Sequence, residues 1–169
     1  MRQMAAAGRF YPGTASDLRE TLDDFYSSAE TEVQARNVLA PHAGYPFSGA
    51  CAAYAYRALQ PAETYVILGP CHFVSTRQPA VSTQAWQTPL GELQVDNKFI
   101  DSLSGVQPAE EPHAEDHAIE VQLPFLQHRF KDFKIVPIAL GQIDVSGALE
   151  LARNIDQAAE ASGKDVSVI

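Results

Sequence analysis

A short apolar run that ends in glycine and proline restricts the fold of this chain more than any other feature. Residues 65–68 are Tyr-Val-Ile-Leu, and Gly69 and Pro70 follow at once. A run that is apolar at every position and only a few residues long is typical of a strand buried on both faces of a parallel sheet. The sequence therefore predicts an α/β fold built around a mainly parallel sheet.

A second unit with the same layout precedes this run. We predict a strand over residues 33–40 that ends at Pro41, and a helix that starts at Ser48 and presents small side chains for close packing. Strand, helix and strand then form a βαβ unit, whose crossover is almost always right-handed and whose strands are parallel. Both strands therefore end at the same edge of the sheet, which is where open α/β sheets bind ligands.

Residues that cap helices predict three further helices. Thr14 or Ser16 can cap an amphipathic helix, and Asp96 can cap a short one. Asp144 or Ser146 can cap a final helix with a buried apolar face. With these helices, the expected architecture is a three-layer sandwich around the sheet.

The segment between these helices is predicted to be more β-like. Residues 85–95 indicate two short strands joined by a turn at residues 89–91. Residues 104–115 are polar and contain proline and glutamate, so we expect a surface loop there.

Two prolines modify the predicted elements of the second half. Asp116 is expected to open a helix that Pro124 kinks or ends. Residues 134–140 are predicted to form another buried strand, in which Pro137 favours an edge or a bulge over a regular central position.

The length of the chain and its last residues set the expected domain organisation. With 169 residues, of which 46% are hydrophobic, the chain suits one domain, residues 1–169. It closes in residues 166–169, a strand pattern with nothing after it, although the loop after a strand carries the chemistry in this fold class. We therefore expect an α/β fold that is incomplete at its C-terminus.

Charge and cysteine content exclude some classes of partner. The net charge is −9, and the 12 Lys and Arg residues are scattered, which argues against binding to nucleic acid or an anionic membrane. Cys51 and Cys71 form no spaced disulfide framework, which favours a reducing compartment. No apolar run is long enough for a membrane span, so we predict a cytoplasmic location.

His42 and His72 are the main candidates for chemistry. Each stands directly after a predicted strand, in a loop that also contains glycine and proline, so a rigid scaffold can aim it into a cleft. Neutral imidazole suits iron, copper or zinc. The alternative is that each is an ordinary loop histidine bound to the backbone.

A second cluster lies between His113 and Glu120. If His117 begins a helix, Glu120 lies one turn later on the same face, where the pair could bind a metal or act as acid and base. The spacing of His113 and His117 suggests a zinc peptidase, but neither H-E-x-x-H nor H-x-x-E-H is present. The alternative is a solvated helix start with acidic residues in its first turn.

Cys71 beside His72 raises a third possibility, a thiolate nucleophile paired with an imidazole. Neighbours on an extended loop usually point apart, which argues against this pairing.

Four motifs, taken in order, resemble the Memo family, which includes the AmmeMemoRadiSam system protein B. They are Pro-His-Ala-Gly-Tyr at residues 41–45, Ile-Leu-Gly-Pro-Cys-His at 67–72, Thr-Pro-Leu-Gly at 88–91 and Glu-Asp-His-Ala-Ile-Glu-Val-Gln-Leu-Pro at 115–124. The resemblance implies a fold similar to class III extradiol dioxygenases, which hold non-haem iron with two histidines and a carboxylate.

The same resemblance implies roles for four residues. His42 and His72 would be metal ligands for iron or copper, and His117 and Glu120 would line the pocket as candidate catalytic residues. The family continues with a Ser-Ser-Asp-Phe-x-His segment and a later cysteine ligand, which these 169 residues lack. The family also commonly has serine where this chain has Cys71.

These observations favour a metal-binding protein related to the dioxygenases, which could be an oxidoreductase acting on a small molecule. One alternative is a non-catalytic adaptor that binds a peptide or a partner protein, such as a protein of the AmmeMemoRadiSam system, in the same cleft. Another is an inactive fragment, since a sheet without its later strands exposes an edge and apolar surface.

Overall fold

A computed structural model describes residues 1–169, and a five-stranded sheet in the order β5-β2-β6-β1-β7 forms its centre. Strands β1 and β6 are parallel, as are β1 and β7, and β2 and β5, whereas β2 runs antiparallel to β6. The predicted α/β class with a mainly parallel sheet is therefore confirmed. The strands of this sheet are β1 (Thr64–Pro70), β2 (Ala80–Val81), β5 (Gln107–Pro108), β6 (Lys134–Leu140) and β7 (Val166–Val168).

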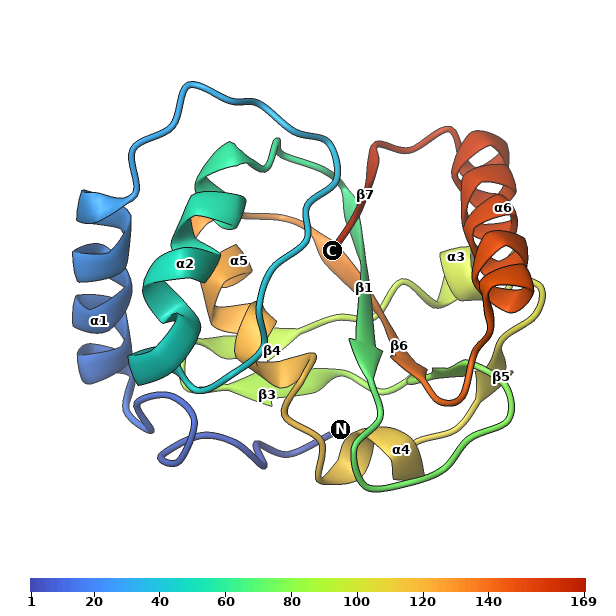
Figure 1. The fold of residues 1–169 in the computed structure, drawn as a ribbon, viewed down its shortest axis with the longest axis horizontal. Coiled ribbons are helices and arrows are strands. Elements are labelled where there is room, and N and C mark those ends of the chain that lie inside the picture. The colour runs from blue at the N-terminus through green and yellow to red at the C-terminus, as the bar shows by residue number, and fades with distance from the viewer.

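Helices flank the sheet on both sides, as Figure 1 shows: α1, α2 and α5 lie on one side, and α3 and α6 on the other. A separate two-stranded hairpin, β3 and β4, lies near the lower end of α5 in that view. These elements are α1 (Ala15–Ser28), α2 (Tyr45–Ala58), β3 (Trp86–Thr88), β4 (Gly91–Leu93), α3 (Asn97–Ile100), α4 (Glu111–Ala114), the 3-10 turn η1 (Glu120–Gln122), α5 (Leu123–Arg129) and α6 (Val145–Ser162).

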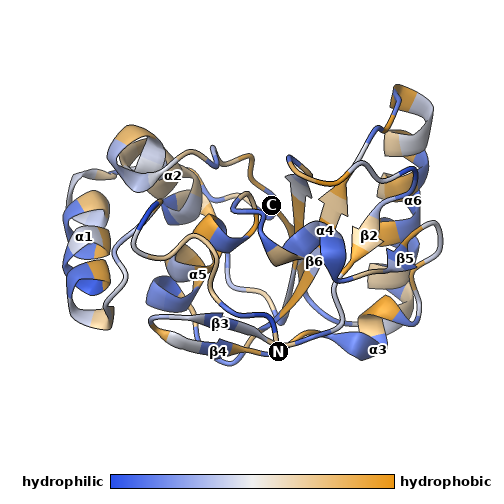
Figure 2. Cartoon of the chain, turned by 90° about the horizontal axis from the view of Figure 1, so that it is seen from below, coloured by the Kyte–Doolittle hydropathy of each residue, from blue (hydrophilic) through white to orange (hydrophobic).

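The core forms where β1 and β6 meet the helices. The first four residues of β1 and the five central residues of β6 are buried, as expected for strands covered on both faces. In Figure 2 the strands β2 and β6 are coloured as hydrophobic, whereas α1 and α6 mix hydrophobic and hydrophilic residues. Each of these two helices therefore gives one face to the core and one to water.

Local signals predicted three helix starts and the hairpin correctly. The side chain of Thr14 accepts from Asp17 N–H, that of Asp96 from Phe99 N–H, and that of Asp144 from Gly147 N–H. The hairpin β3–β4 turns where the sequence indicated, and β7 lies within the strand predicted at residues 166–169.

The strand predicted over residues 33–40 is wrong. This segment has only one isolated bridge, between Ala35 and Leu59, and its apolar side chains Val33 and Leu39 are exposed. Val38 N–H still donates to Val168 C=O, so the segment runs beside β7 without forming a ladder. A strand needs a face to bury, and only part of this segment finds one.

The edge position or bulge predicted from Pro137 is also wrong, because β6 lies between β2 and β1. Alternate N–H groups of β6 point to opposite neighbours: that of Lys134 bonds on the β1 side and that of Ile135 on the other side. Pro137 has the orientation of Ile135, but β2 pairs only with residues 138 and 139. Pro137 C=O accepts from Ser82 N–H, the residue after β2, so the proline lies at the end of this short pairing, where its missing N–H affects one hydrogen bond at most.

Three other boundaries differ from the sequence predictions. Pro124 occupies the first turn of α5, where a missing N–H costs nothing, and no helix starts at Asp116. Helix α2 begins at Tyr45, with Pro46 in its first turn, rather than at Ser48. The expected surface loop at residues 104–115 contains β5 and α4.

None of the helices has the length and apolar character needed to cross a membrane.

Gly69 in β1 allows the segment that follows His117 to pack directly on the strand. A Cβ atom at Gly69 would lie 2.7 Å from Ile119 Cγ1. Gly69→Ala should therefore lower the free energy of unfolding by about 1–3 kcal/mol, measured by urea denaturation. Gly13→Ala is the control, because its Cβ would come no closer than 3.4 Å to any atom, and an equal loss in both variants would contradict the prediction.

Asp96 should make the stability depend on acid pH. Burial raises the pKa of this carboxyl group. Hydrogen bonds from Lys164, Thr64 and Phe99 N–H lower the pKa by more, so its value in the folded protein lies below the ordinary one. The carboxylate therefore stabilises the fold above the unfolded pKa of about 3.9, and this contribution is lost as the pH falls below that value. Asp96→Asn should reduce the difference in unfolding free energy between pH 6 and pH 3, while Asn at the exposed Asp101 should leave the difference unchanged.

Candidate functional site

Three histidines far apart in the sequence meet beside the end of β1. The ring centroids of His42 and His72 are 5.3 Å apart, those of His72 and His117 4.7 Å, and those of His42 and His117 6.0 Å. One nitrogen from each ring lies within 4.8 Å of the other two. The structure thus brings together the two predicted metal ligands and one predicted catalytic residue.

The loop that carries His42 is fixed from two directions. Pro41 C=O accepts a hydrogen bond from Gln122 Nε2 at 3.2 Å, and Tyr45 N–H donates to Phe10 C=O at 2.7 Å. The buried phenol of Tyr45 donates to Val121 C=O at 3.0 Å. Both η1 and the N-terminal segment therefore set the position of His42.

His72 lies in the loop that follows β1, and Asp116 holds it. The His72 backbone N–H donates to Asp116 Oδ2 at 2.6 Å, and the ring Nδ1 lies 3.1 Å from Asp116 Oδ1. An ionised carboxylate only accepts, so this contact assigns the ring proton to Nδ1. Nε2 then carries the free lone pair, which is the usual arrangement in carboxylate–histidine–metal sites.

The ring of His117 is stacked between two other rings. Phe10 lies on it with a centroid distance of 4.0 Å and an interplanar angle of 23°, and His72 stacks at 4.7 Å and 12°. His117 precedes η1, and its C=O accepts from Val121 N–H. Its orientation therefore depends on the N-terminal segment as well as on its own loop.

The surroundings favour neutral rings. Burial lowers the pKa values of His42 and His117, the nearby His72 lowers them further, and the charge of Asp116 opposes both effects. The net direction is downward for both residues. Neutral imidazole is the form that binds a metal, so the lowered pKa values favour the form of His42 and His117 that a metal ligand requires.

The helix predicted to begin at His117 does not form, and the carboxylate of Glu120, three residues later, faces the N-terminal segment. It is fully buried and accepts hydrogen bonds from Arg2, from Ala5 and Ala6 N–H at 2.9 Å each, and from the Tyr11 phenol at 2.7 Å. A catalytic role for Glu120 stays a prediction.

The other candidate residues lie apart from the cluster. The thiol of Cys71 lies 3.7 Å from Pro112 C=O, with no contact to His72 of the kind that a nucleophile and its base make. His113 is buried, with Nε2 3.0 Å from Ala80 C=O and its ring edge-on to Trp86. It does not pair with His117 as in a zinc peptidase.

An apolar cavity of about 540 Å³ adjoins the cluster. It is lined by His42 and His117 together with Phe10, Pro41, Ala43, Gly44 and Phe47. Phe47 is 88% exposed, and Phe73, whose ring lies 6.3 Å from that of His72, is 64% exposed. A ligand that reached the histidines would therefore meet mainly apolar surface.

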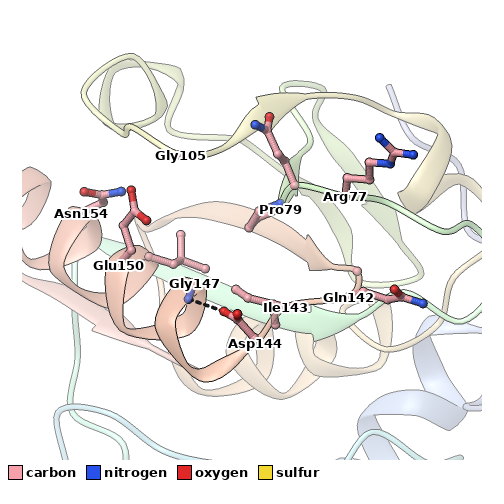
Figure 3. A pocket seen from close by; sticks show the side chains of 12 residues that line it. Arg77, Pro79, Gly105, Gln142, Ile143, Asp144, Gly147, Glu150 and Asn154 are labelled. Carbon is pink, nitrogen blue, oxygen red and sulfur yellow. Dashed lines mark hydrogen bonds between the residues drawn. The ribbon is translucent and has the colours of Figure 1, made fainter.

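A larger cavity, of about 770 Å³, is shown in Figure 3 and lies at the start of α6. Its walls carry charges of both signs, Arg77 opposite Asp144 and Glu150, and none of the histidines. The dashed line in Figure 3 marks the bond by which Asp144 caps α6 at Gly147 N–H. This carboxylate is already paired, so we place the candidate site at the histidines.

Neither Phe10 nor Arg2 stands out in the sequence as a functional residue, and Asp116 is only weakly indicated. Asp116 stands next to His117 in an acidic segment, and a carboxylate beside a candidate histidine is a signal worth testing. Phe10 and Arg2 act on residues more than 100 positions away, so no local pattern identifies them.

Fold and site together define a class: an α/β protein with a histidine cluster beside the end of a central parallel strand. Residues 2–169 match the family described as Memo-like protein. The chain belongs to the Memo family.

Curated relatives are consistent with this assignment. A MEMO1 family protein of Methanosarcina barkeri is 43% identical over 175 residues, and one of Archaeoglobus fulgidus is 42% identical over 171 residues. A third, from Pyrococcus abyssi, is 40% identical over 184 residues. All of this chain is covered in each comparison, and it spans 65%, 65% and 63% of the length of these relatives.

Asp116→Ala should destabilise the loops that carry His72 and His117. The substitution leaves the backbone N–H groups of His72 and Ala118 without their acceptor, which should cost about 1–3 kcal/mol of unfolding free energy. Urea denaturation at pH 7 measures the loss. Alanine at the exposed neighbour Glu115 should change stability by less than about 0.5 kcal/mol, and a similar loss at both positions would refute the prediction.

Proposed function

We propose that His42, His72 and His117 bind a divalent first-row metal ion, iron or copper, in a site related to that of the non-haem iron dioxygenases. The observation that carries this proposal is the convergence of three imidazoles from three separate loops. Imidazole nitrogen is a good ligand for both metals. The sequence alone pointed to two histidine ligands, and His117 offers a third within the same 169 residues.

The geometry supports this assignment. Metal–nitrogen distances are about 2.0–2.1 Å, so two nitrogens on one ion are separated by roughly 4 Å at most. The three nitrogens lie within 4.8 Å of one another, so small ring rotations suffice to close them on an ion. The bond from His72 Nδ1 to Asp116 and the neutral state favoured for His42 and His117 prepare the rings for this role.

An ion with three protein ligands keeps open positions, where it supplies Lewis-acid or redox chemistry to a bound small molecule. The protein contributes the open apolar hollow beside His42 and His117, which would hold the body of the substrate. Asp116 would keep the His72 ring in one tautomer. If only His42 and His72 bound the metal, His117 would instead serve as a proton donor or acceptor beside it. A dioxygenase-like oxidoreductase is the reaction class we propose.

A second candidate function is non-catalytic binding of a peptide or of a partner protein, such as a component of the AmmeMemoRadiSam system. The exposed rings of Phe47 and Phe73 beside the histidines favour this alternative, because apolar side chains at a surface commonly mark interaction sites. Binding of this kind should survive chelation of the metal, whereas substrate turnover should not.

Metal analysis of protein purified and loaded with iron or copper without oxygen tests the first function. Alanine at His42, His72 or His117 should weaken binding by more than about 100-fold, since even removal of outer-shell partners costs 10- to 100-fold. His128 is the matched control, because it contacts Asp23 and Tyr26 instead of the cluster. Equal metal content in the control and in the three variants would refute the proposal.

A further inference from the structure

Arg2 joins the N-terminal segment to the loop that carries His117. Its Nε donates to His113 C=O and one terminal nitrogen to Asp116 C=O, both at 2.8 Å. The other terminal nitrogen pairs with Glu120, and the guanidinium lies 4.2 Å from the centroid of the Trp86 ring. The side chains of Arg2 and Glu120 are only 5% and 0% exposed.

Glu120 completes the connection from the other side of His117. Its carboxylate accepts from the N–H groups of Ala5 and Ala6 and from the Tyr11 phenol. The ion pair thus contacts the Asp116 carbonyl, directly before His117, and includes the side chain of Glu120, three residues after His117. Phe10 belongs to the same N-terminal segment and stacks on the His117 ring.

Stability alone does not account for a buried ion pair of this kind. Two charges lose their hydration on burial, and apolar side chains of similar volume often stabilise a fold equally well. What an apolar pair cannot do is direct several donors at defined acceptors. The planar guanidinium fixes its donors in a fork. Here they engage the carbonyls of His113 and Asp116 before His117 and the carboxylate of Glu120 after it.

We infer that Arg2 and Glu120 are positioning residues for the histidine cluster. Their ion pair holds the N-terminal segment against residues 113–117, and it thereby places Asp116 behind His72 and Phe10 against His117. The inference rests on the proposed function only where metal binding is the readout. The position of His117 can be tested in metal-free protein.

The first experiment measures the accessibility of His117 without metal. His117 has a side chain only 15% exposed, so diethyl pyrocarbonate should modify it slowly in the wild-type protein. In Arg2→Met and in Glu120→Gln, mass spectrometry should find the modification of His117 several-fold faster, with His128 as an internal reference. The double variant Arg2→Met with Glu120→Gln leaves no unpaired buried charge, so it is the test if a single variant fails to fold.

The second experiment titrates the same proteins with Co²⁺ without oxygen. Loss of the ion pair should weaken binding by about 10-fold, the lower end of the effect of a direct outer-shell partner, because Arg2 and Glu120 act through Asp116 and Phe10. It should also change the visible absorption of the bound cobalt. Asp96→Asn is the matched control, because it breaks another buried ion pair, with Lys164, at the opposite end of β1. It should lower stability and leave both His117 modification and the cobalt spectrum unchanged.

The outcomes separate the two proposals. If the variants lose stability as Asp96→Asn does but keep the wild-type modification rate of His117 and the wild-type cobalt spectrum, the pair is only structural and the inference is overturned. If the wild-type protein binds none of the metals tested, the proposed function fails, and the modification rate alone decides the inference.

Discussion

The hydrogen bonds between His72 and Asp116 join two loops, and the candidate site depends on this junction. One carboxylate holds the backbone and the ring of His72, and it also accepts from Ala118 N–H beyond His117. Because β1 ends at Pro70, the rigidity of the central strand passes directly to His72 and through Asp116 to His117. Gly69 also holds the loop of His117 close to the strand, since only a residue without Cβ lets Ile119 approach β1 so closely. His72 and His117 are therefore held by contacts that lead directly to the central strand.

The sequence predicted well those elements whose deciding contacts are local. The caps at Thr14, Asp96 and Asp144 each bond to a group three residues away, and the hairpin is defined by its own turn. The predictions failed where a distant contact decides. Residues 33–40 have the composition of a strand, but few of their side chains reach the core. Pro137 is tolerated in an interior strand because it lies at the end of the short pairing with β2.

The candidate site shows the same difference between residues that local patterns identify and residues that distant contacts position. His42 and His72 could be singled out because each follows an apolar run and precedes a glycine or follows a proline, and His117 because of the motif around it. Local patterns alone could not bring His117 to the other two histidines, and only the family resemblance placed it in their pocket. In the structure, the loop of His117 is positioned by contacts with Gly69 and Asp116. Phe10 and Arg2 are ordinary residues in the sequence. Their roles depend on contacts with residues more than 100 positions away, which only the folded chain brings together.

The ion pair of Arg2 and Glu120 also has a consequence for how the chain folds. Its partners are separated by 118 residues, and closing so long a loop costs conformational entropy before any contact repays it. Contacts of this range form slowly and late, whereas helices and hairpins form early. The histidine cluster would then be assembled at the end of folding. A nascent or partly folded chain would carry all three histidines but not yet the site, which separates the moment of synthesis from the moment at which a metal could be captured.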